Sequence, residues 1–66
     1  TPYTADMLHR KFGFCYIGMT AFATDYGLDM EKAYTFAQMR QIVREKGHKP
    51  SLRNYKRELK QINIIQ

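Results

Sequence analysis

The chain has 66 residues, with 11 Lys and Arg, six Asp and Glu, and a net charge of +5. This length allows one domain with a small core, which buries only about 60% of the surface that the unfolded chain exposes. The single cysteine, Cys15, excludes an intrachain disulfide, and Cys15, His9 and His48 do not have the spacing of a zinc site. We therefore expect one domain, residues 1–66, that binds no metal and no other cofactor.

The sequence lacks the features of a membrane protein and of the common enzyme classes. Its longest mostly apolar stretch, residues 12–23, is shorter than the ~20 residues of a membrane span. It contains no GxxxxGK[ST], HExxH or GxSxG motif and no paired carboxylates, so we expect no enzyme. A lone cysteine suits a reducing compartment, which favours an intracellular protein of the cytoplasm, nucleus or nucleoid. Because the chain begins at Thr1 rather than Met, we expect it to be a fragment of a longer protein.

The first two predicted elements are short helices. Residues 5–12 read as a helix for which Thr4 is a good N-cap. Apolar side chains then recur at helical spacing, at Cys15, Met19, Phe22 and Tyr26. This stripe predicts a second helix that ends at Gly27 and buries Cys15. Residues 14–17 alone are also compatible with a strand, because aromatic and β-branched side chains cluster there; helix is the interpretation that we favour.

The third predicted helix has signals at both of its ends. Asp29 is a suitable N-cap, and Glu31 suits the positive first turn. Arg44 and Lys46 suit the negative last turn, before Gly47 at the C′ position. Its apolar positions are Met30, Ala33, Tyr34, Phe36, Ala37, Met39, Ile42 and Val43. They surround most of the helix, which predicts that this is the central helix of the core.

A break at residues 47–51 precedes the fourth predicted helix, residues 52–62. Pro50 disfavours helix at the residue before it, and Ser51 is a good N-cap for the residues that follow. A narrow apolar stripe, typical of a surface helix, is formed by Leu52, Tyr55, Leu59 and Ile62. The fold class that we predict is therefore all-α, a small domain of three or four helices.

The charge is concentrated in the second half of the chain. Residues 34–66 contain eight bases and two acids, a net charge of +6, whereas residues 1–33 contain three bases and four acids. On a straight helix, Arg53, Lys56, Arg57 and Lys60 share one arc, about 130° from the apolar stripe. Such like charges repel one another unless an anion neutralises them, and a helix N-terminus also attracts anions. The predicted binding region is 44–62, with the site residues Arg44, Lys46, His48, Lys49, Ser51, Arg53, Asn54, Lys56, Arg57 and Lys60.

Double-stranded DNA is the ligand that this pattern favours, with RNA as the alternative nucleic acid. Arg and Asn are suited to bidentate contacts with base edges, which we expect of Arg53, Asn54 and Arg57. Phosphate contacts are expected of Lys46, Lys49, Lys56 and Lys60. A helix, a short turn and a basic helix over residues 33–62 resemble a helix-turn-helix unit. The five-residue turn is closer to winged-helix relatives, whose wing would follow residue 66.

A protein-interaction or oligomerisation domain is the alternative interpretation. Four Met and nine aromatic residues exceed what a core of this size is expected to bury, leaving some for a protein partner or a second copy of the chain. The expected surface comprises Phe12, Phe14, Tyr16, Ile17, Met19 and Phe22. A lipid surface is a weaker alternative, and we expect no membrane partner, because the stripe of residues 52–62 lacks Trp and Phe.

Overall fold

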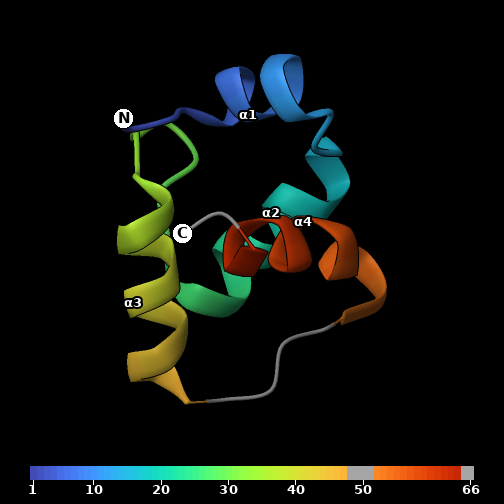
Figure 1. Cartoon of the computed structure of the whole chain (residues 1–66). Helices are drawn as coiled ribbons and strands as arrows, with labels where there is room; N and C mark the ends of the chain where they lie inside the picture. Colours follow the sequence, from blue (N-terminus) through green and yellow to red (C-terminus); the bar gives the residue numbers. More distant parts are fainter. Residues whose placement is uncertain (48–51, 65–66) are drawn as a thin grey trace.

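The described part of the chain forms four helices, and the predicted small all-α domain is confirmed. The computed structural model describes residues 1–47 and 52–64, and in the last helix the side chains of residues 52–54 and 63–64 lie outside the described set. The helices are α1 (Ala5–Phe12), α2 (Tyr16–Tyr26), α3 (Phe36–Lys46) and α4 (Leu52–Ile64) (Figure 1). The described residues contain no β-strand. A single β-bridge joins the N-terminal segment to the segment before α3, where Tyr3 and Tyr34 exchange two backbone hydrogen bonds of 2.8 and 2.9 Å.

The central helix is α2, which packs against α1, α3 and, most extensively, α4. The prediction that the third helix occupies the centre is therefore wrong. No residue of α2 before Asp25 is charged, and its small residues Gly18 and Ala23 are buried. A helix that is apolar on most sides is buried by its neighbours. In Figure 1, α1 crosses one end of the molecule and α3 runs along one side, with α2 and α4 between them.

The predictions for the first two helices are confirmed except at Cys15. The hydroxyl of Thr4 accepts a hydrogen bond of 3.2 Å from the Met7 N–H, which caps α1 at its N-terminus. Gly27 ends α2 at a φ of 69°, in the left-handed region that glycine adopts without strain. Cys15 precedes the first turn of α2 and is exposed, so the prediction that it is buried is wrong. The strand interpretation of residues 14–17 is also wrong, because the helix begins at Tyr16.

Helix α3 begins at Phe36, and its N-cap lies six residues after Asp29, the N-cap that the sequence suggested. Thr35 is the N-cap, and it forms a reciprocal capping box with Gln38 through hydrogen bonds of 3.0 and 2.8 Å. Asp29 instead stabilises a turn, accepting a hydrogen bond of 2.9 Å from the Glu31 N–H. The β-bridge of Tyr34 keeps that residue extended, so the helix cannot begin before it. The predicted end, with the cap at Gly47, is confirmed.

The core draws on every helix and is dominated by aromatic and methionine side chains. It consists of Leu8, Phe14, Met19, Phe22, Tyr26, Phe36, Met39, Tyr55 and Ile62. Edge-to-face ring pairs connect distant segments: the centroids of Phe12 and Phe36 are 5.3 Å apart, and those of Phe22 and Tyr55 are also 5.3 Å apart. None of the described helices is long and apolar enough to cross a membrane.

Helix α4 is interrupted at Tyr55, whose φ of −146° and ψ of 29° are not helical. Tyr55 is completely buried, and its hydroxyl donates a hydrogen bond of 2.6 Å to Asp25 Oδ2 of α2. The predicted apolar stripe is confirmed at Tyr55 and Ile62, which are buried, and at Leu59, which is half-buried. Leu52 lies outside the described side chains. Because the helix is not straight, the single arc calculated for residues 53–60 does not hold across Tyr55.

Candidate nucleic-acid interface

Five of the ten predicted site residues have described side chains, and all five are exposed. They are Arg44, Lys46, Lys56, Arg57 and Lys60. His48, Lys49 and Ser51 lie outside the described residues, as do the side chains of Arg53 and Asn54. The structure therefore places two bases in the last turn of α3 and three on α4 after the interruption. We call Arg44 and Lys46 the basic pair, and Lys56, Arg57 and Lys60 the basic triad.

The basic pair and the basic triad have no acidic partners in the described part of the chain. The ion pair found there is in α1, where Arg10 Nε lies 3.1 Å from Asp6 Oδ2. The second half contributes only two acids, of which Glu58 is buried with 4% exposure and Glu45 is exposed on α3. The positive charge of these five residues is therefore not neutralised by the described carboxylates, and it remains available to an anionic ligand.

Two of these cations lie beside the ends of other helices. A Cβ added at Gly13, the C-cap of α1, would lie 3.2 Å from Arg57 Nη2. A Cβ added at Gly27, the C-cap of α2, would lie 3.6 Å from Lys46 Nζ. The carboxyl end of a helix is partially negative and attracts cations by about 0.3–1 kcal/mol. This placement was not predicted, because it depends on tertiary packing that brings the side chain of Arg57 to the end of α1 and that of Lys46 to the end of α2.

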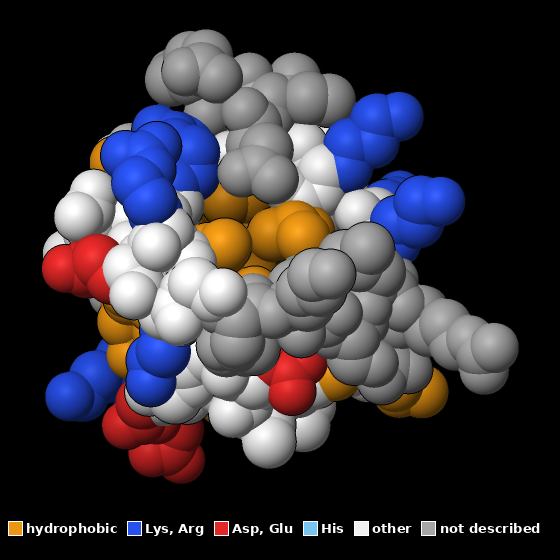
Figure 2. Space-filling view, turned by 90° about the horizontal axis from the view of Figure 1, so that it is seen from below, with side chains coloured by type: hydrophobic (Ala, Val, Ile, Leu, Met, Phe, Trp, Pro, Cys, Tyr) orange, Lys and Arg blue, Asp and Glu red, His pale blue; other side chains and the backbone are white. Residues whose placement is uncertain are grey.

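Arg57 of the basic triad and Lys46 of the basic pair consequently lie at opposite ends of α2. Gly13 comes shortly before the first residue of α2, and Gly27 directly follows its last residue. Figure 2, seen from below, shows basic side chains on the α3 side and others on the side where α4 begins, with apolar side chains visible between them. The positive surface is therefore divided into two groups, rather than being one continuous arc on α4.

The predicted protein-docking surface is largely part of the core. Phe14, Met19 and Phe22 are 2%, 6% and 5% exposed, so the prediction is wrong for these three residues. Met19 and Phe22 face inward because α2 packs against the other three helices, and Phe14 joins the same core from the turn before α2. Phe12 is half-buried, and only Tyr16 and Ile17 are clearly exposed, at 44% and 75%. Two adjacent exposed residues do not make an apolar surface of the size that protein partners use.

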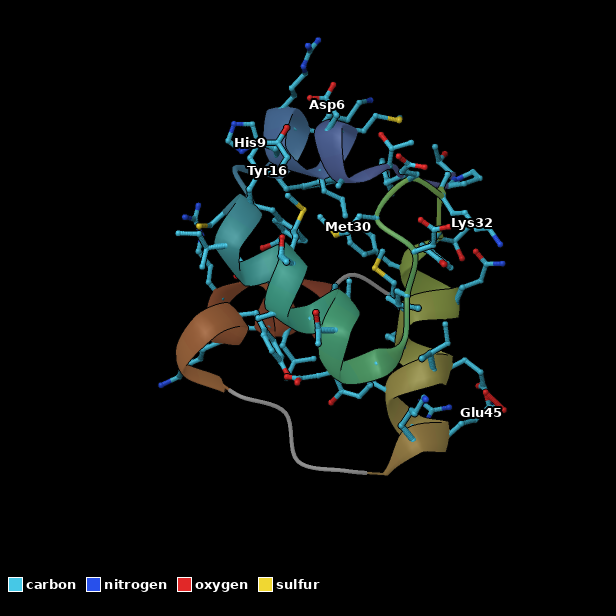
Figure 3. The ribbon with its side chains drawn as sticks, turned by 180° about the vertical axis from the view of Figure 1, so that it is seen from behind. Asp6, His9, Tyr16, Met30, Lys32 and Glu45 are labelled. Atoms are coloured by element: carbon cyan, nitrogen blue, oxygen red, sulfur yellow. The ribbon has the colours of Figure 1, made fainter. Side chains whose placement is uncertain are left out.

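A polar cluster that the sequence analysis missed joins α1 to the start of α2 (Figure 3). The Tyr16 hydroxyl donates a hydrogen bond of 3.0 Å to Asp6 Oδ1, and this bond raises the pKa of Tyr16 above its usual value. The rings of His9 and Tyr16 are in contact, with centroids 4.5 Å apart and planes tilted by 32°, and His9 Nδ1 lies 2.7 Å from the Phe14 carbonyl oxygen. The Asp6–Arg10 spacing of four residues is visible in the sequence. The hydrogen bond from Tyr16 could not be read in the same way, because the turn between α1 and α2 decides that Tyr16 lies beside Asp6.

A second polar cluster is buried between α2 and α4. It contains Asp25, Tyr55 and Tyr26, and the last of these is only 1% exposed. Burial raises the pKa of Tyr26, and the nearby Asp25 carboxylate raises it further, while the Tyr55 hydroxyl partly offsets both effects. These groups hold the two helices together, and Tyr26 also lines the groove next to Lys46.

The described residues form no metal site, and their core cavity is smaller than a typical site for a small ligand. No three His, Cys, Asp or Glu side chains among them are arranged to hold a metal. The cavity in the core has a volume of about 40 Å³ and is lined mainly by apolar side chains. Sites for small ligands typically have about 300–1,000 Å³. An open groove of about 540 Å³ lies between the end of α2 and α3, next to Lys46.

Comparisons of this chain with known protein families, with curated proteins and with solved structures gave no match.

Proposed function

We propose that this domain binds double-stranded DNA through the basic pair and the basic triad. The observation that carries the proposal is the exposure of these five bases without an acidic partner in the described part of the chain. His48, Lys49, Ser51, Arg53 and Asn54 belong to the same proposed interface through their position in the sequence, between the two groups. In the proposal, lysines bind phosphates, while Arg53, Asn54 and Arg57 face base edges.

Phosphate binding supplies both the affinity and the dependence on salt. Each lysine or arginine that neutralises a phosphate of a duplex releases counterions and adds about 0.9 to the slope of log affinity against log salt. Five such contacts would weaken binding about 500-fold between roughly 50 and 200 mM salt. RNA remains the alternative ligand within this proposal, because phosphate contacts alone do not distinguish the two nucleic acids.

Fluorescence anisotropy with a mixed-sequence duplex tests the proposal at several salt concentrations. Lys60→Gln should lower the salt slope by about 0.9, because it removes one phosphate contact. Lys32→Gln removes the same charge from an exposed position between α2 and α3, and should leave the slope unchanged. Absence of binding by the unmodified domain at about 50 mM salt would rule out the proposal, and equal effects of the two substitutions would rule out this surface.

A further inference from the structure

We infer that the cavity in the core is a binding site for water, in which the carboxylate of Glu58 is the main hydrogen-bond acceptor. The inference is independent of the proposed function, because Glu58 belongs neither to the basic pair nor to the basic triad. It follows from the burial of this acid, from the lack of a partner for it among the described residues, and from the small cavity that it lines.

Among the described residues, Glu58 is the charged one that the fold buries. It lies on α4 between the exposed Arg57 and the half-buried Leu59, and is itself only 4% exposed. No hydrogen bond or ion pair joins its carboxylate to another described residue. Asp25 of α2, by contrast, is bound by the Tyr55 hydroxyl. Removal of a carboxylate from water is unfavourable unless new hydrogen bonds compensate it, so Glu58 requires donors that the described side chains do not supply.

The cavity beside Glu58 has the size of a water site. Its volume is about 40 Å³. A cavity accepts a water molecule from about 10–15 Å³ upwards, so this one accommodates about one or two. Apolar cavities stay dry, whereas waters occupy those that offer hydrogen-bonding groups. Most of the wall is apolar, including Leu8, Met19 and Met39. Glu58 makes the cavity polar, because both of its carboxylate oxygens accept hydrogen bonds.

The segment between α2 and α3 gives water a route to this site. It supplies Asp29 and Lys32, which line the cavity and are exposed, so the cavity reaches the surface there. Figure 3 shows Lys32 directed away from the core, in agreement with the lack of an ion pair to Glu58. No three His, Cys, Asp or Glu side chains in the described part of the chain are grouped to hold a metal, which favours water as the occupant.

Nuclear Overhauser transfer from water to methyl groups of the cavity wall tests the inference. Water bound in the cavity tumbles with the protein and transfers magnetisation to nearby protons, here the methyl groups of Leu8, Met19 and Met39. Glu58→Met removes the acceptor with little change in length, and Glu58→Gln keeps a carbonyl acceptor. Glu45→Met, at an exposed position of α3, is the control for the same change outside the cavity. Circular dichroism verifies that each variant keeps its helices.

Cross-peaks between water and these methyl groups are expected in the unmodified domain, in Glu58→Gln and in Glu45→Met, and should be lost in Glu58→Met. Their absence in the unmodified domain would overturn the inference, because the cavity would then be dry. Their persistence in Glu58→Met would also overturn it, because other groups or exchanging tyrosine hydroxyls would then produce the signal. Loss in Glu58→Gln would show that a carbonyl acceptor does not hold the water, which contradicts the role given to Glu58.

A crystal structure of the unmodified domain is the second measurement, and it does not depend on the folding of Glu58→Met. An ordered water about 3 Å from a carboxylate oxygen of Glu58 is expected. A protein side chain at that position, or no density there, would overturn the inference. Neither measurement involves nucleic acid, so a failure of this inference and a failure of the proposed function are told apart.

Discussion

The two halves of the chain use their charged side chains in different ways. In the first half, Asp6 and Asp25 accept hydrogen bonds from tyrosine hydroxyls, and Asp29 stabilises a turn. In the second half, the described bases of the basic pair and the basic triad are exposed and form no ion pair with a described carboxylate. The comparison indicates that carboxylates of the first half support the fold, while the five bases of the basic pair and the basic triad are exposed to solvent. Substitutions in each half can test this division.

The largest loss of stability is expected at Tyr55, which connects α4 to Asp25 of the first half. Tyr55→Ala should destabilise the domain by about 3–5 kcal/mol, because it removes a buried aromatic ring. Tyr55→Phe should cost about 1–3 kcal/mol, because the ring remains but Asp25 loses its hydrogen bond. Urea unfolding followed by circular dichroism measures both values. Equal stabilities for Tyr55→Phe and the unmodified domain would show that this carboxylate does not support the fold.

A smaller loss of stability is expected at Gly13 of the first half, which lies next to Arg57 of the basic triad. Gly13→Ala and Gly47→Ala each place a side chain at a positive φ, of 70° and 63°, which costs roughly 1–2 kcal/mol. Gly13→Ala should cost more, because its Cβ would lie 3.2 Å from Arg57 Nη2, whereas a Cβ at Gly47 meets nothing within 4 Å. Thermal unfolding of both variants measures the difference.

Arg57→Ala provides the internal test of this contact. Combined with Gly13→Ala, it should bring the cost of the glycine substitution down to that of Gly47→Ala. If Gly13→Ala and Gly47→Ala lower the stability equally when Arg57 is present, the contact between Arg57 and Gly13 does not affect the substitution.

The smallest effect is a loss of stability at alkaline pH, caused by the buried Tyr26 of the first half. Because the pKa of Tyr26 is raised in the folded state, the folded protein holds this proton at pH values where the unfolded chain releases it. Stability should therefore be complete below about pH 10, the usual tyrosine pKa, and should fall as the pH rises above it. In Tyr26→Phe this part of the decline should be absent. Urea unfolding between about pH 8 and 11 measures it, and identical pH profiles for the two proteins would contradict the assignment.

Local signals in the sequence were sufficient where a helix end depends on neighbouring residues. Thr4 and Gly27 were identified as caps because their hydrogen bonds or dihedral angles involve residues within one turn. The start of α3 was misplaced because two capping signals, at Asp29 and Thr35, compete in the sequence. The contact that decides between them is the β-bridge of Tyr34 with Tyr3, far away in the chain.

The sequence by itself determined the all-α class, most helix ends and the accumulation of bases in the second half, since these follow from residue type and short-range spacing. Tertiary structure alone decided that α2 is central, that α4 is interrupted at Tyr55 and that Arg57 and Lys46 lie at opposite ends of α2. The physical reason is that these features depend on which surfaces are buried together. Periodicity shows that a helix has an apolar side, but the neighbour that covers it, and the cations carried along with that neighbour, depend on how the whole core packs.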